Sequence, residues 1–185
     1  YQNRPLLFEL NIKLPELLYD RVVEVSERLD AKGNVIRKLD EESVRKALKQ
    51  AKSDGINGVA IAFMHSYINS DHEEKIAQIA IEEKFLQVSV SHQVSPLMKL
   101  VGRGDTTVVD AYLSPILRRY VDQVSSELIN SKSTKLMFMQ SNGGLTDAKL
   151  FQGKDALLSG PAGGVVSMVQ TGIQAGFNKL IGFDM

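Results

Sequence analysis

Ser159-Gly-Pro-Ala-Gly-Gly164 opens a run of small residues, and the apolar stretch Lys179-Leu-Ile-Gly-Phe183 follows it and leads to Asp184. The small residues predict a helix over 162–175, and the apolar stretch predicts a strand. An aspartate directly after such a strand stands where a glycine-rich turn that binds phosphate is expected to follow. This stretch therefore indicates an α/β fold and points to nucleotide chemistry.

The start of the predicted helix carries residues that suit an anion. Ser159 or Gly160 is the expected cap, and the free N–H groups at a helix start attract negative charge. Pro161 fits the first turn, where its missing N–H leaves no hydrogen bond unmade. Gly163 and Gly164 each cost roughly 1 kcal/mol relative to Ala, which indicates a close approach of the backbone. Packing against another element and contact with a ligand explain these glycines equally well.

A second candidate loop follows the apolar stretch 135–139, which predicts another buried strand. Ser141, Asn142, Gly143 and Gly144 come directly after it. Ligands gather at the carboxyl ends of strands in open α/β sheets, where backbone N–H groups cradle anions. A plain tight turn is the alternative interpretation, because Asn-Gly is a common turn dipeptide that tolerates left-handed backbone.

Asp184 is the candidate catalytic and metal-binding residue. A carboxylate at the end of a strand can hold a hydrated Mg²⁺ ion or orient an attacking water molecule. The alternative is an ordinary aspartate that caps the loop after the strand.

The first hundred residues predict an α/β unit in which strands alternate with helices. Alternating apolar and charged residues predict a half-buried strand over 20–28, and residues 32–34 predict a turn to a partner strand at 35–36. The nearly continuous apolar run 58–64 is typical of a buried parallel strand. The other elements are a helix capped by Asp40 with Val44, Ala47, Leu48 and Ala51 inside, a helix capped by Asp71 with Ile76, Ile79, Ala80 and Phe85 inside, and a strand at 88–90.

The second half opens with a long helix over about residues 106–131, which Pro115 is expected to kink or restart. Its predicted buried face consists of apolar residues at helical spacing: Val108, Val109, Tyr112, Ile116, Leu117, Tyr120 and Val121. A cluster of Pro and Gly within 92–104 indicates a boundary. We therefore divide the chain into an α/β subdomain over 1–100 and a second region over 101–185.

The composition argues against several classes of protein. The 22 Lys and Arg residues balance the 22 Asp and Glu residues, so no net charge attracts nucleic acid or an anionic membrane. No apolar run is long enough to span a bilayer. The sequence has no Cys, which excludes disulfides and thiolate metal sites and is compatible with a cytoplasmic protein. Because it starts at Tyr1 and ends at Met185, we expect an internal piece of a longer protein.

Two further groups of polar residues have both a functional and a structural interpretation. His65, His72 and Glu73 follow the strand predicted at 58–64 and could suggest a metal site. The two histidines lack a third ligand at the spacing typical of such a site, so a turn and a helix cap are the favoured interpretation. Arg103 and Asp105 could steer a carboxylate or a phosphate, but a solvated loop is the favoured interpretation.

Several blocks of sequence, read together, resemble one known family. The most informative blocks are Ala62-Phe-Met-His-Ser-Tyr67, Thr106-Thr-Val-Val-Asp-Ala-Tyr-Leu113, Met139-Gln-Ser-Asn-Gly-Gly-Leu145, Leu158-Ser-Gly-Pro-Ala-Gly-Gly-Val-Val166 and Gly182-Phe-Asp-Met185. They resemble the oxoprolinase/hydantoinase A family, whose members are ATP-dependent hydrolases and carboxylases acting on small cyclic amides and ketones. This chain contains neither of the family's two phosphate loops, one of which follows the last block.

The resemblance implies a truncated part of an actin-like, or ribonuclease H-like, ATPase architecture, with mainly parallel sheets. In that architecture ATP and Mg²⁺ lie in a cleft between two domains. Asn142, Gly143 and Gly144 would line the cleft, Asp184 would lie near Mg²⁺ and phosphate, and the helix start at 159–164 would form the hinge. Many proteins of this architecture have an acidic residue near that helix start, where it activates a water molecule. This chain has no acidic residue there, so we assign that role to none of its residues.

The reaction implied by the resemblance is hydrolysis coupled to ATP. Phosphorylation of a lactam or imide oxygen would make it a good leaving group, and water would then open the ring. The implied substrate is a small cyclic amide such as 5-oxoproline or hydantoin, the implied partner is a hydantoinase B-type subunit or domain, and His65 is a minor candidate for substrate contact. We expect the 185 residues alone to be inactive. The alternatives are a non-catalytic module that binds a partner and an acetone-carboxylase-type subunit.

Overall fold

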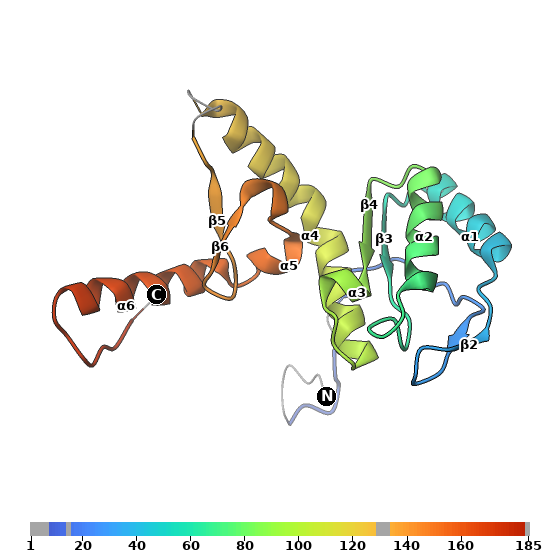
Figure 1. Cartoon of the computed structure of the whole chain (residues 1–185), viewed down its shortest axis with the longest axis horizontal. Helices are drawn as coiled ribbons and strands as arrows, with labels where there is room; N and C mark the ends of the chain where they lie inside the picture. The colour runs from blue at the N-terminus through green and yellow to red at the C-terminus, as the bar shows by residue number, and fades with distance from the viewer. Residues whose placement is uncertain (1–7, 14–15, 129–133, 184–185) are drawn as a thin grey trace.

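The computed structural model describes residues 8–13, 16–128 and 134–183 (Figure 1). In Figure 1 the elements that precede the long helix α4 lie on one side of it, and those that follow lie on the other. The first group is β1 (Arg28–Leu29), β2 (Val35–Arg37), α1 (Glu41–Ser53), β3 (Gly58–Ile61), α2 (Asp71–Glu82), β4 (Gln87–Val90) and α3 (Ser91–Val94). Then come α4 (Leu100–Glu127), β5 (Met137–Met139), β6 (Leu145–Asp147), a 3₁₀ turn (Ala148–Leu150), α5 (Gly153–Ala156) and α6 (Ser159–Gln174).

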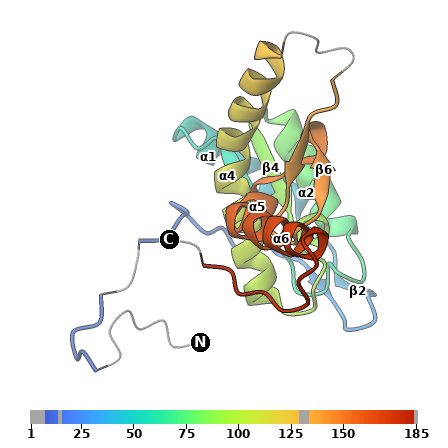
Figure 2. The same cartoon turned by 90° about the vertical axis from the view of Figure 1, so that its left-hand side faces the viewer.

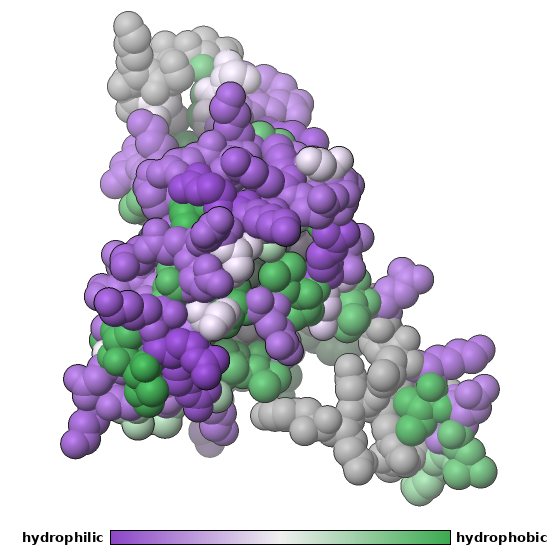
Figure 3. Space-filling model, turned by 90° about the vertical axis from the view of Figure 1, so that its right-hand side faces the viewer, coloured by the Kyte–Doolittle hydropathy of each residue, from purple (hydrophilic) through white to green (hydrophobic). Residues whose placement is uncertain are grey.

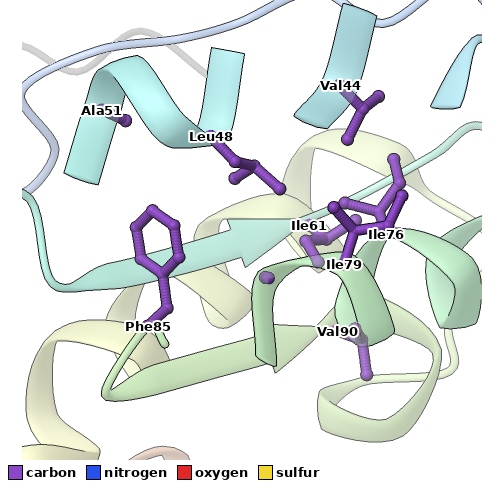
Figure 4. Packing of buried hydrophobic residues seen from close by; sticks show 9 residues of the cluster. Val44, Leu48, Ala51, Ile61, Ile76, Ile79, Phe85 and Val90 are labelled. Carbon is purple, nitrogen blue, oxygen red and sulfur yellow. The ribbon is translucent and has the colours of Figure 1, made fainter. Parts of the chain in front are cut away.

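Strands β3 and β4 form a parallel pair whose register runs from Gly58 opposite Gln87 to Ile61 opposite Val90. Helices α1 and α2 pack against one face of this pair, and α4 packs against the other (Figure 4). The side chains alternate accordingly, because Val90 belongs to the core while Ser89 before it faces α4. The predicted α/β unit is confirmed here, although β3 is shorter than the predicted strand 58–64.

The hydrophobic core lies between α1, α2 and the β3–β4 pair (Figure 4). Its buried members are Val44, Leu48, Ala51, Ile61, Ile76, Ile79, Ala80, Phe85 and Val90. Asp40 caps α1 as predicted, since its carboxylate accepts the N–H of Ser43 at 3.1 Å. The cap of α2 is Ser70 instead of Asp71, which is the first residue of the helix. The outer side of this unit is largely hydrophilic (Figure 3), as expected for helices that bury one face.

The strand predicted over 20–28 is wrong for most of its length. Only Arg28 and Leu29 form a ladder, an antiparallel pair with β2. Val25 packs against the core, while Val22 and Val23 are exposed, so only part of the apolar pattern in this segment corresponds to burial. A strand also needs a neighbouring strand, and the described residues provide none beside 21–27.

The prediction of mainly parallel sheets is also wrong for the described residues. Beside the parallel β3–β4 pair, β1–β2 and β5–β6 are both antiparallel pairs. Each joins its strands through a short turn, and a parallel pair would require a long crossover connection. Residues 179–183, predicted as a strand, lie in no ladder of the described part. The actin-like architecture stays a prediction.

The buried face of α4 differs from the prediction. Of the apolar residues expected inside, Tyr112, Ile116 and Tyr120 are at least half exposed, and only Val121 is buried. The remaining buried residues of the helix are all polar: Arg103, Thr107, Asp110 and Ser114. The helix faces polar groups on its neighbours, which explains why a polar stripe is buried there. It begins at Leu100, earlier than predicted, and continues through Pro115; the predicted end at 129–131 lies outside the described residues.

Both groups of elements contact α4, which packs against β3 and β4 as well as against α5. The proposed division at residue 100 coincides with the start of this helix and stays a prediction. Helix α6 projects from α5 and the β5–β6 hairpin, away from the first group (Figures 1 and 2). None of the helices that the structure describes has both the length and the apolar character needed to cross a bilayer.

Candidate functional site

The segment 141–144 is the tight turn of the β5–β6 hairpin. Gly143 has a φ of +82°, and its N–H donates to the carbonyl of Gln140 at 2.9 Å. The side-chain Oδ1 of Asn142 accepts the N–H of Gly144 at 2.8 Å. Asn142 and Gly143 therefore have the local role predicted for a turn. The preceding strand β5 is only partly buried, so the prediction of a buried strand at 135–139 is wrong.

Helix α6 begins at Ser159, one or two residues earlier than a cap at Ser159 or Gly160 would imply. Leu158 is the cap and Ser159 is the first helical residue, so neither Ser159 nor Gly160 caps the helix. The Ser159 hydroxyl donates to the carbonyl of Ala156 at 2.9 Å. Pro161 lies in the first turn as predicted, where its lack of an N–H leaves no helical hydrogen bond unmade.

The structure brings the hairpin turn and the start of α6 together. The Ser141 hydroxyl accepts the N–H of Leu158 at 2.9 Å, immediately before the helix. A Cβ added to Gly143 would lie 3.2 Å from the Val166 side chain, and one added to Gly163 would lie 3.6 Å from the Met139 side chain. Two segments about twenty residues apart in the sequence thus form one local surface.

The three glycines at the start of α6 have two different surroundings. Gly163 faces Met139 of β5, which supports the packing interpretation for that position. A Cβ added to Gly160 or to Gly164 would meet no described atom within 4 Å. The open space beside these two glycines, and the N–H groups of the first turn that lack helical acceptors, fit a phosphate group.

Asp184, the predicted catalytic and metal-binding residue, lies outside the described residues. Within the described residues, no group of three or more His, Cys, Asp and Glu side chains is arranged to hold a metal ion. The role of Asp184 in catalysis and in binding Mg²⁺ therefore stays a prediction.

The histidines that follow β3 do not form a metal site with Glu73. His72 pairs with Glu27, with 2.7 Å between Nδ1 and Oε2, and so holds the extended segment 21–27 against α2. The Nδ1 atom of His65 is buried and has no hydrogen-bond partner among the described residues. The structural interpretation of His72 is supported, and the predicted substrate contact of His65 stays untested.

Glu73 belongs to a buried polar cluster at the carboxyl ends of β3 and β4. Its Oε1 accepts the N–H of Phe63 at 2.9 Å and the hydroxyl of Ser91 at 2.6 Å. Its Oε2 accepts the backbone N–H of His92 at 3.0 Å and lies 2.7 Å from that residue's Nδ1. The carboxylate thus ties the loop after β3 to the residues after β4.

Arg103 completes this cluster, and the prediction that it lies on a solvated loop is wrong. It is fully buried on α4, and its Nε donates to the Ser91 hydroxyl at 2.8 Å. The rest of its guanidinium donates to backbone carbonyls, those of Phe63, Met64, Leu97 and Met98. Arg103 therefore fixes both loops at this edge of the parallel pair.

Sequence reasoning missed the buried polar residues of α4. Their signal was the spacing of Arg103, Thr107, Asp110 and Ser114, which places them on one face of a helix. Gly153 was also missed. A Cβ at this position would lie 2.7 Å from the backbone nitrogen of Ser114, so α5 packs against α4 through its backbone.

Family models and individual known proteins both match this chain, and they indicate the same family. Residues 1–84 match the family description Hydantoinase/oxoprolinase N-terminal region, and residues 103–185 match Hydantoinase/oxoprolinase. The 5-oxoprolinase of Saccharomyces cerevisiae is 42% identical in an alignment that includes all of this chain and 16% of that protein. The chain therefore spans about a sixth of the length of this relative.

Two solved structures have a similar fold. A nucleotide-free acetone carboxylase, described in connection with ATP-dependent acetone carboxylation, matches with a TM-score of 0.74 and 26% identity. That match covers 83% of this chain and 22% of the other. The ATP-dependent caprolactamase of Pseudomonas jessenii matches with a TM-score of 0.70 and 28% identity over 80% of this chain and 22% of the other.

Proposed function

The chain belongs to the hydantoinase/oxoprolinase family, and from this premise we propose that it forms part of an ATP-dependent hydrolase that opens a small cyclic amide. The substrate we propose is of the 5-oxoproline or hydantoin type. The observation that supports this most directly is the 42% identity to a 5-oxoprolinase over the whole chain. The similarity in fold to an ATP-dependent caprolactamase, whose name also denotes a lactam substrate, supports the same reaction class.

We assign the nucleotide to the surface formed by the hairpin turn and the start of α6. The N–H groups of the first turn of α6 would donate to phosphate oxygens, and the positive end of the helix dipole would stabilise their charge. Gly160 and Gly164 would let the phosphate approach the backbone, because no described side chain occupies the space beside them. Asn142, Gly143 and Gly144 would form the neighbouring wall.

The bound nucleotide would supply the phosphoryl group that activates the amide oxygen. Water would then add to the activated carbon, the ring nitrogen would leave as the amine, and a second water would release the phosphate from the resulting acyl phosphate. Asp184 would hold Mg²⁺ near the phosphates, since a carboxylate is a preferred ligand of this ion. The share of this chain in the reaction is to bind and orient the nucleotide and to stabilise developing charge. Its relatives are much longer, so we propose that further domains or a hydantoinase B-type subunit complete the enzyme.

The test of this function is ADP release by the longer protein that contains this chain, with 5-oxoproline or hydantoin added. We expect the cyclic amide to stimulate ADP release, and Asp184→Ala to lower the stimulated rate by at least about tenfold, because a ligand of the metal is lost. Stimulation by acetone instead would move the assignment to an acetone-carboxylase-type subunit. A protein that neither binds nor hydrolyses ATP would favour the non-catalytic module.

Gly164→Ala tests the assignment of the nucleotide surface. Alanine is the better helix former and meets no described atom here, so α6 should gain about 0.5–1 kcal/mol in stability. If the phosphate approaches this glycine, the same change should weaken ATP binding about tenfold in a nucleotide titration, because the methyl group occupies ligand space. Gly104→Ala in α4 is the control, because its Cβ would make only an ordinary 4.0 Å contact. Unchanged ATP affinity in Gly164→Ala would argue against phosphate contact at this position.

A further inference from the structure

A buried carboxylate on α4, that of Asp110, joins elements that are far apart in the sequence. Asp110 is only 3% exposed. Its Oδ2 accepts the hydroxyl of Ser89 in β4 at 2.7 Å, and its Oδ1 accepts the hydroxyl of Ser114 in α4 at 3.1 Å. The same Oδ1 accepts the backbone N–H of Lys154 in α5, also at 3.1 Å. These donors are neutral, so the buried charge is stabilised only while β4, α4 and α5 keep this arrangement.

Helix α5 is anchored to α4 at the end that contacts Asp110. The N–H of Gly153 donates to the Ser114 hydroxyl oxygen at 3.0 Å. The absence of a side chain at Gly153 lets the two backbones approach. The Nζ of Lys154 donates at 2.6 Å to the carbonyl of Val94, the last residue of the short helix α3 that follows β4. The position of α5 is thus set by the first α/β unit together with α4.

The other end of α5 holds both segments of the proposed nucleotide surface. The carbonyl of Asp155 accepts the N–H and the hydroxyl of Ser141, each at 2.7 Å. Ser141 begins the hairpin turn, and its hydroxyl oxygen also accepts the N–H of Leu158, the cap of α6. A continuous path of hydrogen bonds and one short helix therefore leads from Asp110 to the turn and to the start of α6.

We propose that Asp110 is a positioning residue for the nucleotide surface: by holding α5, it sets the turn at 141–144 against the start of α6. The proposal rests on the function proposed above for the identity of the ligand. The positioning itself rests on the contacts just described. Asp110 touches neither segment directly and acts through α5.

Hydrogen exchange in the longer protein tests the positioning without any nucleotide. We expect Asp110→Ala to raise amide exchange over residues 140–145 and 158–164 about tenfold, because both segments lose the support of α5. Asp110→Asn should stay close to wild type, since its amide oxygen still accepts from Lys154 and its NH₂ group can donate to Ser89. If Asp110→Ala does not fold, Ser114→Ala takes its place, because it removes the acceptor for Gly153 and should have the same effect.

The matched control is Glu73→Ala, which removes another buried carboxylate that also accepts several hydrogen bonds. Glu73 makes no hydrogen bond to α5, so its loss should raise exchange around residues 63–67 and 91–98 and leave 140–145 unaffected. Equal exchange over 140–145 in the Asp110 and Glu73 variants would overturn the positioning proposal. Such a result would mean that Asp110 contributes to the overall stability of the protein and does not position the turn.

The kinetics of ADP release give the second readout. Loss of positioning should raise the KM for ATP about tenfold in Asp110→Ala, whereas loss of folded protein alone lowers the apparent kcat and leaves KM unchanged. An unchanged KM in this variant would overturn the link to nucleotide binding. A wild-type protein that does not turn over ATP would instead contradict the proposed function, and the exchange data would still decide whether Asp110 holds the two segments.

Discussion

Replacing Arg103 by Met should destabilise the protein by about 3–5 kcal/mol, the range expected when one partner of a buried charged network is removed. Met can fill much of the volume of the side chain but donates no hydrogen bond. The carbonyls of Leu97 and Met98 and the hydroxyl of Ser91 would lose their donor in a site where Arg103 itself is fully buried. The Glu73 carboxylate would also lose the positive charge that Ser91 connects to it.

Urea denaturation of Arg103→Met beside wild type measures this effect. Arg119→Met is the matched control, because Arg119 lies on the exposed side of the same helix and its loss should change stability by less than about 0.5 kcal/mol. Arg103→Lys should recover only part of the loss, since an ammonium group cannot reproduce the planar fork that reaches two separate loops. Equal midpoints for the two Met variants would show that the loops after β3 and β4 keep their structure without the guanidinium group.

Arg103 also shows where sequence reasoning fails. Its neighbours Gly102 and Gly104 indicated a loop, yet tertiary contacts extend α4 through both glycines. The apolar residues Tyr112 and Ile116 indicated the buried face, yet the helix buries its polar side because the groups that face it are a hydroxyl of β4 and the backbone of α5. Helical spacing was correctly recognised, but the identity of the buried face depends on the neighbours, which a single helix does not encode.

Elements governed by local chemistry were predictable. The cap at Asp40 and the turn at Asn142 and Gly143 depend on residues within a few positions of one another. The inner faces of α1 and α2 were also predictable, because their neighbours form an apolar core that matches the apolar stripe of each helix. The strands expected at 20–28 and 179–183 depend on a partner strand, so the apolar pattern alone was not sufficient. For the candidate site, the two glycine-rich segments were recognised from sequence, but their contact through Ser141 and α5 was not, because it joins side chains to distant backbone.

Gly153→Ala should destabilise the protein by about 1–3 kcal/mol, the usual cost of overpacking a well-packed contact. A Cβ at this position would lie 2.7 Å from the backbone nitrogen of Ser114 and 2.9 Å from the Cβ of Leu113. Neither atom can move without bending α4, so α5 must move away instead. That movement would lengthen the hydrogen bonds from Gly153 to Ser114 and from Lys154 to Asp110.

The change at Gly153 is informative because it displaces α5 without altering any polar side chain. Thermal or urea unfolding gives the stability, and Gly102→Ala is the control, since alanine in the first turn of α4 meets no described atom and should be neutral or stabilising by up to about 1 kcal/mol. If α5 transmits the position of α4 to the hairpin turn, Gly153→Ala should also raise amide exchange at 140–145, as Asp110→Ala does. A destabilised variant with wild-type exchange there would mean that α5 supports the fold while the turn and the start of α6 hold each other in place through their own contacts, such as the hydrogen bond between Ser141 and Leu158.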